Sequence, residues 1–434
     1  MGGAGHSWGR YPRVDQTVID LADRHRRLPA VEGSLLPYGN GRSYGDSCLN
    51  EGNTLVHTRA LDHFIAFDVY TGVLECEAGL QLSRILDLVV PQGWFVPVTP
   101  GTRFVTIGGA IANDVHGKNH HRAGNFGRHV LELELLRSDG RLLVCSPQTN
   151  PEWFAATIGG LGLTGLVTRA RIQLRRIAGP WMSTEVHRFY NLAGFFRLSE
   201  GADQDFEYTV AWIDCLATGG SLGRGLFTRA NHAPACPDRR PAASSTRLRM
   251  PFTPPFSLVN RFTLRSFNAL YYHRQRQPVI HATTHYEPHF YPLDAIGNWN
   301  RMYGPHGFMQ YQCVVPPSDA EARIAQLLEV IAASGSGSFL AVLKQFGSLA
   351  SPGMLSFPRP GTTLALDFPN QGARTLALLD RLDEIVAAAG GAVYPAKDAR
   401  MSGAHFRQYF PNWDSFLPFV DPQFSSSFWR RVME

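Results

Sequence analysis

Apolar and polar residues alternate along several stretches of the first 178 residues, which indicates short β-strands. The run "FIAFDVYTGVLECEAG" (64–79) predicts two strands joined by a turn at 70–72, and "VLELELLRSDGRLLVCS" (130–146) predicts a hairpin around Asp139-Gly140. "LVTRARIQLRRI" (166–177) alternates again. Helical spacing occurs instead in "LSRILDLVV" (82–90) and "NPEWFAATI" (150–158), and "TIGGAIANDVHG" suggests a short helix that begins with glycines. We therefore expect an α+β arrangement here.

The pattern changes after residue 180, where longer alternating runs contain aromatic residues. Four such runs predict strands: "FEYTVAWIDCL" (206–216), "FMQYQCVVP" (308–316), "SFLAVLKQFG" (338–347) and "TLALDFP" (363–369). Two helical stretches lie near 318–334 and 374–389. This order predicts an antiparallel sheet covered by helices, a second domain. Residues 216–256 show almost no periodicity, so we expect a long flexible loop there.

Composition excludes several classes of protein. The chain has 434 residues, 44% hydrophobic and 18% charged, and its net charge of +5 is modest, so we expect no nucleic-acid partner. No stretch approaches the ~18 apolar residues of a membrane span, and the N-terminus lacks the apolar core of a secretory signal. Six scattered cysteines form no CxxC pair, which favours reduced thiols in a cytoplasmic protein: Cys48, Cys76, Cys145, Cys215, Cys236 and Cys313.

Two glycine-rich stretches are the strongest candidates for ligand binding. "YGNGRSYGD" (38–46) contains three glycines beside polar groups, and glycine lets the backbone approach a ligand closely. In "VTPGTRFVTIGGAIANDVHGK" (98–118), Thr106 is expected to cap a helix opened by Gly108 and Gly109, and a helix N-terminus favours anions. Two such clamps, roughly 60 residues apart, suit a long ligand with a pyrophosphate.

Three further motifs were weighed against ordinary alternatives. "GGLGLTG" (159–165) has the glycine spacing of a dinucleotide fingerprint, but a helix precedes it and a strand follows, the reverse of the required order. "HGKNHH" places His116 and His120 four residues apart beside poor helix formers. It suits anion binding or proton transfer better than a metal site, and a solvated polar turn remains the alternative. No G-x-S-x-G motif supports a serine hydrolase.

Taken together, the first domain resembles the FAD-binding domain of the vanillyl-alcohol-oxidase (PCMH) type of flavoprotein. The resemblance rests on "YGNGRSYGD", "PVTPGTRFVTIGGAIANDVHGKNHHRAGNFG" and "GGLGLTG". "AWID", "GFMQYQ", "LKQFG", "SFPRPG", "LDFP" and "VYPAKDAR" extend it to residue 400, where the chain resembles the decaprenylphosphoryl-β-D-ribose 2-oxidases. The resemblance implies an α+β, two-domain fold. An FAD-binding domain at 1–179 would be completed by 391–434, with a substrate-binding domain at 180–390.

The resemblance also implies FAD as the cofactor. Many relatives attach the flavin covalently to a histidine that follows the second glycine of the first loop, but this chain has Arg42 there, so we expect non-covalent FAD. The expected cofactor-binding residues are Gly39, Asn40, Gly41, Arg42, Ser43, Tyr44, Pro100, Gly101, Thr102, Gly108, Gly109, Ala112, Asn113, Val115, His116, Gly162, Gly165, Leu166 and Tyr394.

The implied reaction oxidises the 2-hydroxyl of a polyprenyl-phosphoryl ribose to a ketone. Lys397 would stabilise the developing alkoxide or the reduced flavin, while His116 and Lys118 would orient the sugar or its phosphate. The expected substrate-binding residues are Tyr44, Lys118, Trp212, Gln312, Lys344, Thr363 and Lys397. A solvated strand face is the alternative for Gln312 and Lys344. Thr363 and Ala365 replace an asparagine and a cysteine of the mycobacterial enzymes, so the pocket wall differs.

The resemblance further implies partners. A separate NADH-dependent short-chain reductase would reduce the ketone, and the substrate would be a lipid-linked sugar phosphate. The 216–256 segment, with Phe252 and Phe256, could cover that lipid or touch an anionic membrane, or be a disordered insertion; its arginines are Arg224, Arg229, Arg239, Arg240, Arg247 and Arg249. We therefore expect a cytoplasmic protein, with peripheral contact at the inner membrane as an option. The rivals are an oxidase of a soluble polyol, sugar or sugar lactone, and a flavin-binding protein without turnover.

Overall fold

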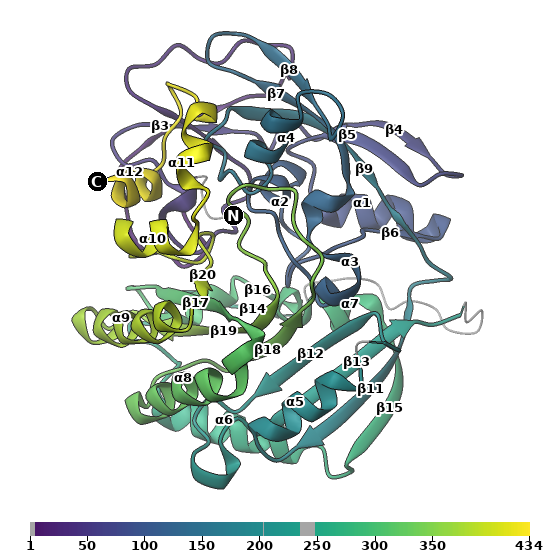
Figure 1. Cartoon of the computed structure of the whole chain (residues 1–434), viewed down its shortest axis with the longest axis vertical. Helices are drawn as coiled ribbons and strands as arrows, with labels where there is room; N and C mark the ends of the chain where they lie inside the picture. The colour runs from purple at the N-terminus through teal and green to yellow at the C-terminus, as the bar shows by residue number, and fades with distance from the viewer. Residues whose placement is uncertain (1–4, 203, 235–247) are drawn as a thin grey trace.

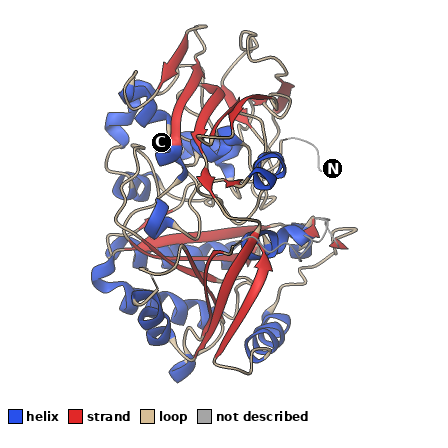
Figure 2. Ribbon diagram, turned by 90° about the vertical axis from the view of Figure 1, so that its right-hand side faces the viewer, coloured by secondary structure: helices blue, strands red, loops and turns tan. Residues whose placement is uncertain are grey.

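The computed structural model describes residues 5–202, 204–234 and 248–434. The chain forms an upper part of smaller sheets and short helices above one broad sheet with helices beneath it (Figure 1, Figure 2). The expected α+β class with two sheet-containing regions is confirmed.

The upper part contains two main sheets. The first is parallel, in the order β1 (Thr17–Asp20), β3 (Thr54–His57), β2 (Leu35–Tyr38). The second is antiparallel, in the order β4 (Phe64–Asp68), β5 (Val73–Glu77), β9 (Leu166–Gln173), β7 (Val130–Leu136), β8 (Leu142–Cys145). Short helices complete this part: α1 (Leu82–Val89), α2 (Ile107–Ala112), α3 (His120–Ala123) and α4 (Pro151–Thr157), with β6 (Trp94–Phe95) paired to β10 (Arg175–Arg176). The strands and helices expected from periodicity are therefore present.

The lower part is built on one eight-stranded sheet. Its order is β15 (Val279–His285), β11 (Trp181–Phe189), β13 (Gly225–His232), β12 (Tyr208–Ile213), β18 (Val342–Phe346), β19 (Gly361–Pro369), β17 (Phe308–Val315), β20 (Ala392–Val393). Its pairings are antiparallel, and the register sets Gln312 opposite Ala365 and Lys344 opposite Thr363. Because side chains alternate between faces, every second residue of these strands faces the upper part.

Helices cover the other face of this sheet. The expected pair is present as α8 (Ala320–Ser334) and α9 (Ala373–Ala388), joined by α5 (Leu192–Glu200) beside β11 and β13 (Figure 1). Apolar side chains from sheet and helices form a continuous core that includes Leu327, Leu343 and Leu366. The remaining elements are α6 (Arg261–His273), α7 (Tyr286–Phe290), and the ribbon of β14 (Leu248–Arg249) and β16 (Ile296–Gly297).

The expectation of a loop over 216–256 is wrong for part of that range. Residues Gly225–His232 form β13, an inner strand between β11 and β12. Arg224 pairs with Asp214 at 2.8 Å and Arg229 with Glu185 at 2.7 Å, so these two cations neutralise carboxylates of the fold. Arg239, Arg240, Arg247 and Cys236 lie outside the described residues. Gly223 and Arg224 obscured this strand, because its run is short and is preceded by turn residues.

The C-terminal segment returns to the upper part. Its helices are α10 (Gly403–Tyr409), α11 (Trp413–Phe416) and α12 (Ser427–Met433), which lie beside the N-terminal strands in Figure 1. The Leu35 N–H donates to the Gln423 carbonyl at 2.7 Å, and Arg431 pairs with Asp46 at 2.8 Å. The segment 391–434 therefore contacts the first fifty residues, although β20 belongs to the lower sheet.

No helix within the described ranges is long and apolar enough to cross a membrane.

Candidate active site

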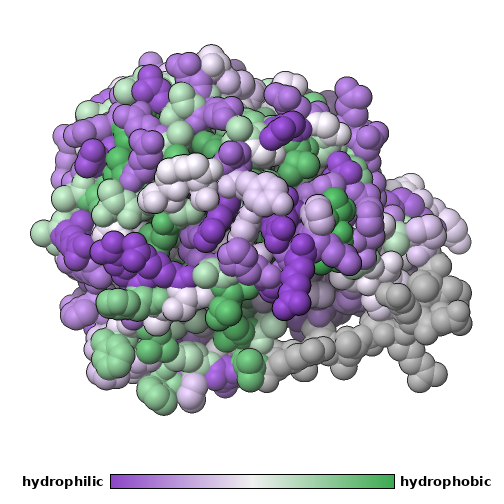
Figure 3. Space-filling model, turned by 90° about the horizontal axis from the view of Figure 1, so that it is seen from below, coloured by the Kyte–Doolittle hydropathy of each residue, from purple (hydrophilic) through white to green (hydrophobic). Residues whose placement is uncertain are grey.

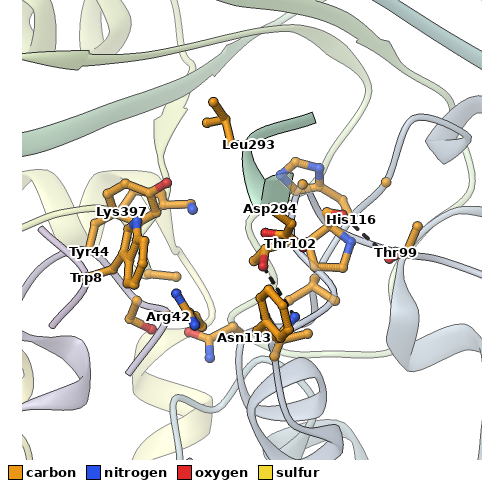
Figure 4. A pocket seen from close by; sticks show the side chains of 18 of the residues that line it. Trp8, Arg42, Tyr44, Thr99, Thr102, Asn113, His116, Leu293, Asp294 and Lys397 are labelled. Atoms are coloured by element: carbon orange, nitrogen blue, oxygen red, sulfur yellow. Dashed lines mark hydrogen bonds between the residues drawn. The ribbon is translucent and has the colours of Figure 1, made fainter. Parts of the chain in front are cut away.

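A cavity of about 690 Å³ lies between the upper part and the broad sheet. Side chains from both parts point into it, with Trp8, Arg42 and Lys397 on one side and His116 and Asp294 on another (Figure 4). All but two of the residues expected to bind cofactor or substrate line this cavity; Leu166 and Thr363 do not.

The first glycine loop presents bare backbone to the cavity. Among the described residues, the backbone N–H groups of 39–43 have no hydrogen-bond acceptor, whereas Tyr44 N–H donates to the Ala396 carbonyl at 2.9 Å. Gly41 has φ +57°, and a Cβ there would collide with the Tyr38 hydroxyl and the His6 carbonyl. Consecutive unpaired N–H groups form a concave anion site, so this loop fits a pyrophosphate.

The Arg42 side chain, which belongs to this loop, lines the cavity. Its guanidinium lies 4.0 Å from the Trp8 ring centroid and 5.4 Å from that of Phe104, and its Nε atom is buried without a partner. Burial lowers the pKa of Arg42, an effect opposed mainly by the Asp294 carboxylate. The cation is therefore held between two rings, with donor capacity left for a ligand.

The glycine-rich stretch 98–118 does not form the anion-binding helix N-terminus that its sequence predicts. Thr106 caps α2 as expected, accepting from Gly109 N–H at 3.2 Å. However, Ile107 N–H donates to Leu80 O and Gly108 N–H to Ala78 O, so these N–H groups are not free for an anion. The glycines here instead allow close packing of α2 on Ala78, while Gly101 and Thr102 line the cavity.

The 159–165 glycines lie on the cofactor side of the cavity. Gly162 and Gly165 have positive φ and line the wall, where residue 162 passes close to Pro37. Leu166 is fully buried at the start of β9, in a cluster with Leu136 and Phe424, and does not reach the cavity. The expectation that Leu166 contacts the cofactor is therefore not supported, because strand alternation turns it to the other face.

Asp114 fixes the strand-like segment that carries His116. It is fully buried at φ +40° and accepts hydrogen bonds from Gly127 N–H at 2.8 Å and from the hydroxyls of Ser351 and Ser356, both at 2.5 Å. The Asn125 amide also donates to it. A buried carboxylate with several donors is rigidly held, so residues 115–118 keep one position relative to the loop after β18.

His116 is the junction between the upper part and the sheet. Its Nε2 atom lies 2.8 Å from the Gln312 amide nitrogen, and its Nδ1 atom lies 3.3 Å from Lys344 Nζ. Burial, then the Lys344 charge, holds the pKa of His116 well below its usual value. The imidazole is therefore neutral near pH 7 and can exchange a proton with a ligand or with Lys344.

Three lysines line the same part of the cavity. Burial lowers the pKa of Lys397 and of Lys118 to about 7, and that of Lys344 to about 8. Asp367 opposes the shift at Lys397, and burial raises its own pKa to about 6. One carboxylate among three ammonium groups leaves an excess of positive charge, which favours an anionic ligand.

Each lysine is held by a specific neighbour. Lys397 Nζ lies 3.9 Å from the centroid of the Tyr44 ring, and Lys118 Nζ donates to the His289 carbonyl. Asp367 accepts from the Gln310 amide at 2.6 Å and from the Tyr303 hydroxyl at 3.2 Å. Lys397 therefore lies beside Tyr44 on the side of the cavity that holds Arg42 (Figure 4), whereas Lys344 lies beside His116.

Thr363 acts behind the cavity wall. Its hydroxyl accepts from the Gln312 amide at 3.2 Å, and the residue is fully buried in β19. The expectation that Thr363 contacts substrate is therefore not supported; it orients Gln312. Trp212 does line the wall, and its indole N–H donates to the Phe339 carbonyl at 2.9 Å.

Several wall residues were not identified as candidates from the sequence. Gln310 and Asp294 line the cavity, and Asp367 contacts Gln310, whereas Ala365, expected in the pocket wall, lines the cavity as well. The period-two spacing of Gln310 with Gln312 could have revealed the first, because both face one side of β17. Asp294 gives no such signal, since it lies in an irregular segment.

His120 does not join His116 at a shared site. Its Nδ1 accepts from Gly347 N–H at 3.1 Å, and its ring lies 4.4 Å from that of Phe346. Nowhere in the described ranges do three or more histidine, cysteine or acidic side chains lie close enough together to hold a metal ion.

Comparison with known proteins agrees with this geometry. Residues 16–146 match the family model of an FAD binding domain. The chain is 34% identical to the decaprenylphosphoryl-β-D-ribose oxidase of Mycolicibacterium smegmatis, over 98% of this chain and 96% of that protein. The chain belongs to this oxidase family. It is an FAD-binding oxidoreductase.

Other relatives show how far each part of the likeness extends. An uncharacterised Streptomyces coelicolor protein is 37% identical over 81% of this chain and its own full length. Cytokinin dehydrogenase 8 of Oryza sativa subsp. indica is 26% identical over 46% of this chain and 40% of its own. Likeness to the oxidase therefore extends over nearly the whole chain, whereas likeness to the cytokinin dehydrogenase covers less than half of it.

The residues present fit FAD. The unpaired N–H groups of 39–43 suit its pyrophosphate, and the wall formed by Gly101, Asn113 and Gly162 leaves room for a long ligand. Tyr394, whose hydroxyl donates to the Asn113 carbonyl at 2.7 Å, closes the wall between this region and the lysines.

Proposed function

We propose that this family member oxidises the 2-hydroxyl of a polyprenyl-phosphoryl-β-D-ribose to the 2-keto sugar. The observation that carries the proposal is that Lys118, Lys344 and Lys397 line the same cavity as the glycine loop. A sugar phosphate needs cationic partners on the side away from the cofactor, and the family relative is named for such a substrate.

The chain's own residues support the chemistry. When bound, FAD accepts the hydride equivalent from the carbinol carbon. Lys397, held by the Tyr44 ring and Asp367, places positive charge where the alkoxide develops. The neutral imidazole of His116 can take the hydroxyl proton, with Lys344 at its other nitrogen. Lys118, in the segment between α2 and α3, would hold the phosphate.

Anaerobic flavin reduction tests this proposal. We expect a synthetic prenyl-phosphoryl ribose to bleach the visible flavin absorbance, whereas free ribose, polyols and sugar lactones do so at least about a hundredfold more slowly, because they lack the phosphate. Bleaching by a soluble sugar or lactone at equal or higher rate would replace this proposal with a soluble-substrate oxidase.

We propose that the FAD is held non-covalently. Arg42 occupies the position where many relatives carry an attaching histidine, and a guanidinium forms no bond to the flavin. Acid precipitation should therefore release the yellow colour into the supernatant. Flavin that stays in the pellet would contradict this.

We also propose that a separate NADH-dependent reductase completes the conversion to arabinose. The 160–165 glycines serve the cavity wall, between a helix and a strand, not a nicotinamide fingerprint. The protein with substrate, an electron acceptor and NADH should accumulate the keto sugar and no arabinose. Formation of the arabinosyl lipid by this protein alone would refute the division of labour. A lipid-linked substrate would also bring the enzyme to a membrane surface.

A further inference from the structure

A run of large apolar side chains is exposed along β14, the segment after it and α6. The exposed residues, together called here the outer apolar surface, are Leu248, Phe252, Phe256, Leu258, Phe262, Phe267 and Leu270. Exposed apolar residues scattered singly are normal, but seven within 23 positions are not. Seen from below, the molecule shows hydrophobic side chains gathered along the lower edge of the picture (Figure 3).

Helix α6 carries apolar residues on the face that a soluble helix keeps polar. Leu264, Asn268 and Tyr272 are buried at helical spacing. Phe262 and Leu270 lie about 120° and about 160° around the helix from the centre of that stripe, and they are 82% and 73% exposed. The packing of α6 on the protein therefore does not account for these two side chains.

The charge around this surface has one sign. From Leu248 to Tyr286 the sequence contains no acidic residue. It contains five arginines, all exposed and none in a salt bridge with a described carboxylate: Arg249, Arg261, Arg265, Arg274 and Arg276. Such a surface repels basic partners and attracts anionic ones.

Further arginines lie beside the segment. The Arg301 guanidinium donates to the carbonyls of Met250 and Pro251, and Arg10 donates to the Thr253 hydroxyl at 3.2 Å. Burial, then repulsion from Arg13 and Arg301, lowers the pKa of Arg10. The basic character therefore extends beyond α6.

The outer apolar surface is continuous with the catalytic cavity. Tyr271 of α6 and Arg274, the residue after the helix, line the cavity, and the Tyr271 ring lies 4.6 Å from that of Trp212. On the other side, Ile296 of β16 lines the cavity and pairs with Leu248 of β14. Helix α6 and the β14–β16 ribbon thus contribute both to the cavity wall and to the outer apolar surface.

The cavity wall between the lysines and Tyr271 is apolar. Val186, Val210, Leu340 and Val342 line it, from strands β11, β12 and β18 and the residues before β18. An apolar passage from the cationic cluster to Tyr271 has the chemistry to hold a hydrocarbon chain whose phosphate lies at the lysines.

We propose that the outer apolar surface docks this protein onto a phospholipid bilayer with anionic headgroups, with the cavity opening toward the membrane. The inference rests on the proposed lipid-linked substrate, whose prenyl chain would pass from bilayer to cavity without crossing water. Apolar side chains would enter the acyl boundary, and the flanking arginines would bind the headgroups, as in interfacial helices.

Vesicle sedimentation tests the surface without any substrate. The holoenzyme should bind vesicles of phosphatidylcholine and phosphatidylglycerol (3:1) much more strongly than pure phosphatidylcholine, and less so at high salt. The double variant Phe262→Ser/Leu270→Ser should bind about tenfold more weakly. The double variant Arg261→Gln/Arg265→Gln should also bind these vesicles about tenfold more weakly, and its binding should depend little on salt.

A matched control removes exposed apolar residues elsewhere. Tyr70→Ser/Leu142→Ser changes side chains that are 92% and 49% exposed on the upper hairpins, and it should bind vesicles as the wild type does. FAD content and unfolding temperature should be the same for all variants, because every substituted side chain is exposed.

Two outcomes would overturn the inference. The first is vesicle binding that does not support the surface: either the wild type binds no vesicles, or the wild type and Phe262→Ser/Leu270→Ser bind both kinds of vesicle equally. The other is a dimer, seen by light scattering, that the double variant converts to a monomer, which would assign the surface to a second copy. A soluble substrate in the flavin assay would refute the proposed function but leave the vesicle result standing.

Discussion

The two sides of the active-site cavity are built in opposite ways. The cofactor side presents backbone N–H groups of five consecutive residues, 39–43, and its chemistry comes from missing side chains. The sheet side presents Lys344, Gln312 and Lys397, from separate strands and a later turn, and its chemistry lies in charged side chains. One short motif encodes a backbone cradle, whereas a cluster of side chains from distant segments forms only when the sheet folds.

This difference also separates the tasks. A backbone cradle provides fixed partial charges that do not titrate, which suits a cofactor that stays bound. The lysines have pKa values near neutrality because burial opposes their charge, so their charge responds to ligand and pH. The strained, cationic side is where turnover should be most sensitive.

The largest expected effect is on the sheet side. Lys397→Met should keep FAD but slow anaerobic flavin reduction by about a hundredfold or more, because it removes charge aimed at the reacting oxygen. Arg374→Met, an exposed cation on α9, is the matched control and should leave the rate unchanged. Stopped-flow flavin bleaching measures both. A wild-type rate in the Lys397 variant would remove this residue from the reaction.

The cradle side should instead fail in cofactor retention. Gly41→Ala should lower FAD affinity about tenfold or more, because the new Cβ collides with the Tyr38 hydroxyl and the His6 carbonyl. Gly52→Ala is matched for backbone strain, since Gly52 has φ +70° but nothing within 4 Å of a new Cβ. The flavin-to-protein absorbance ratio after dialysis measures how much FAD each variant retains. If both variants lose FAD equally, backbone strain and not the cradle is responsible.

Stability should show the cost of the buried cations. The pKa of Lys344 is about 8 in the folded chain and near the ordinary lysine value when unfolded. Between these values the unfolded state binds more protons, so the destabilisation caused by this residue is largest below pH 8 and fades toward pH 10. FAD-free Lys344→Met should unfold about 2–4 °C higher than wild type at pH 7, with a smaller gap at pH 10. A gap that grows with pH would contradict the assigned shift.

The smallest effect should follow a change in the wall that leaves both sides intact. Ala365→Cys adds a thiol to the cavity wall at the position where the family resemblance places a cysteine in the mycobacterial enzymes. Inhibitors that react with that cysteine should give one adduct on the variant and none on the wild type, because a methyl group offers no nucleophile. Intact-protein mass spectrometry counts the adducts. An adduct on the wild type would show that strand β19 is aligned incorrectly with the family.

How much could be predicted from sequence differs between the two sides. The glycines of the 38–46 loop made it a candidate ligand cradle, the family resemblance assigned it to the FAD, and the structure places all of residues 39–44 on the cavity. The role of α2 could not be predicted in this way. Its first N–H groups donate to the carbonyls of Leu80 and Ala78, partners that no local pattern reveals. In the broad sheet, β11, β13, β15 and β20 were not predicted, because polar residues interrupt the alternation of the first three and the last has two residues.

Sequence by itself determined most of the periodic elements, the family resemblance and the 38–46 loop as a candidate ligand cradle, because these depend on neighbours a few residues apart. Only the tertiary structure decided that Lys397 faces Tyr44 and Asp367, that Thr363 lies behind Gln312, and that Leu166 points into the core. It also decided that Phe262 and Leu270 lie outside while Leu264 is buried. The physical reason is that a side chain's burial, and therefore its pKa and its reach, is set by strand pairing and packing between segments hundreds of residues apart.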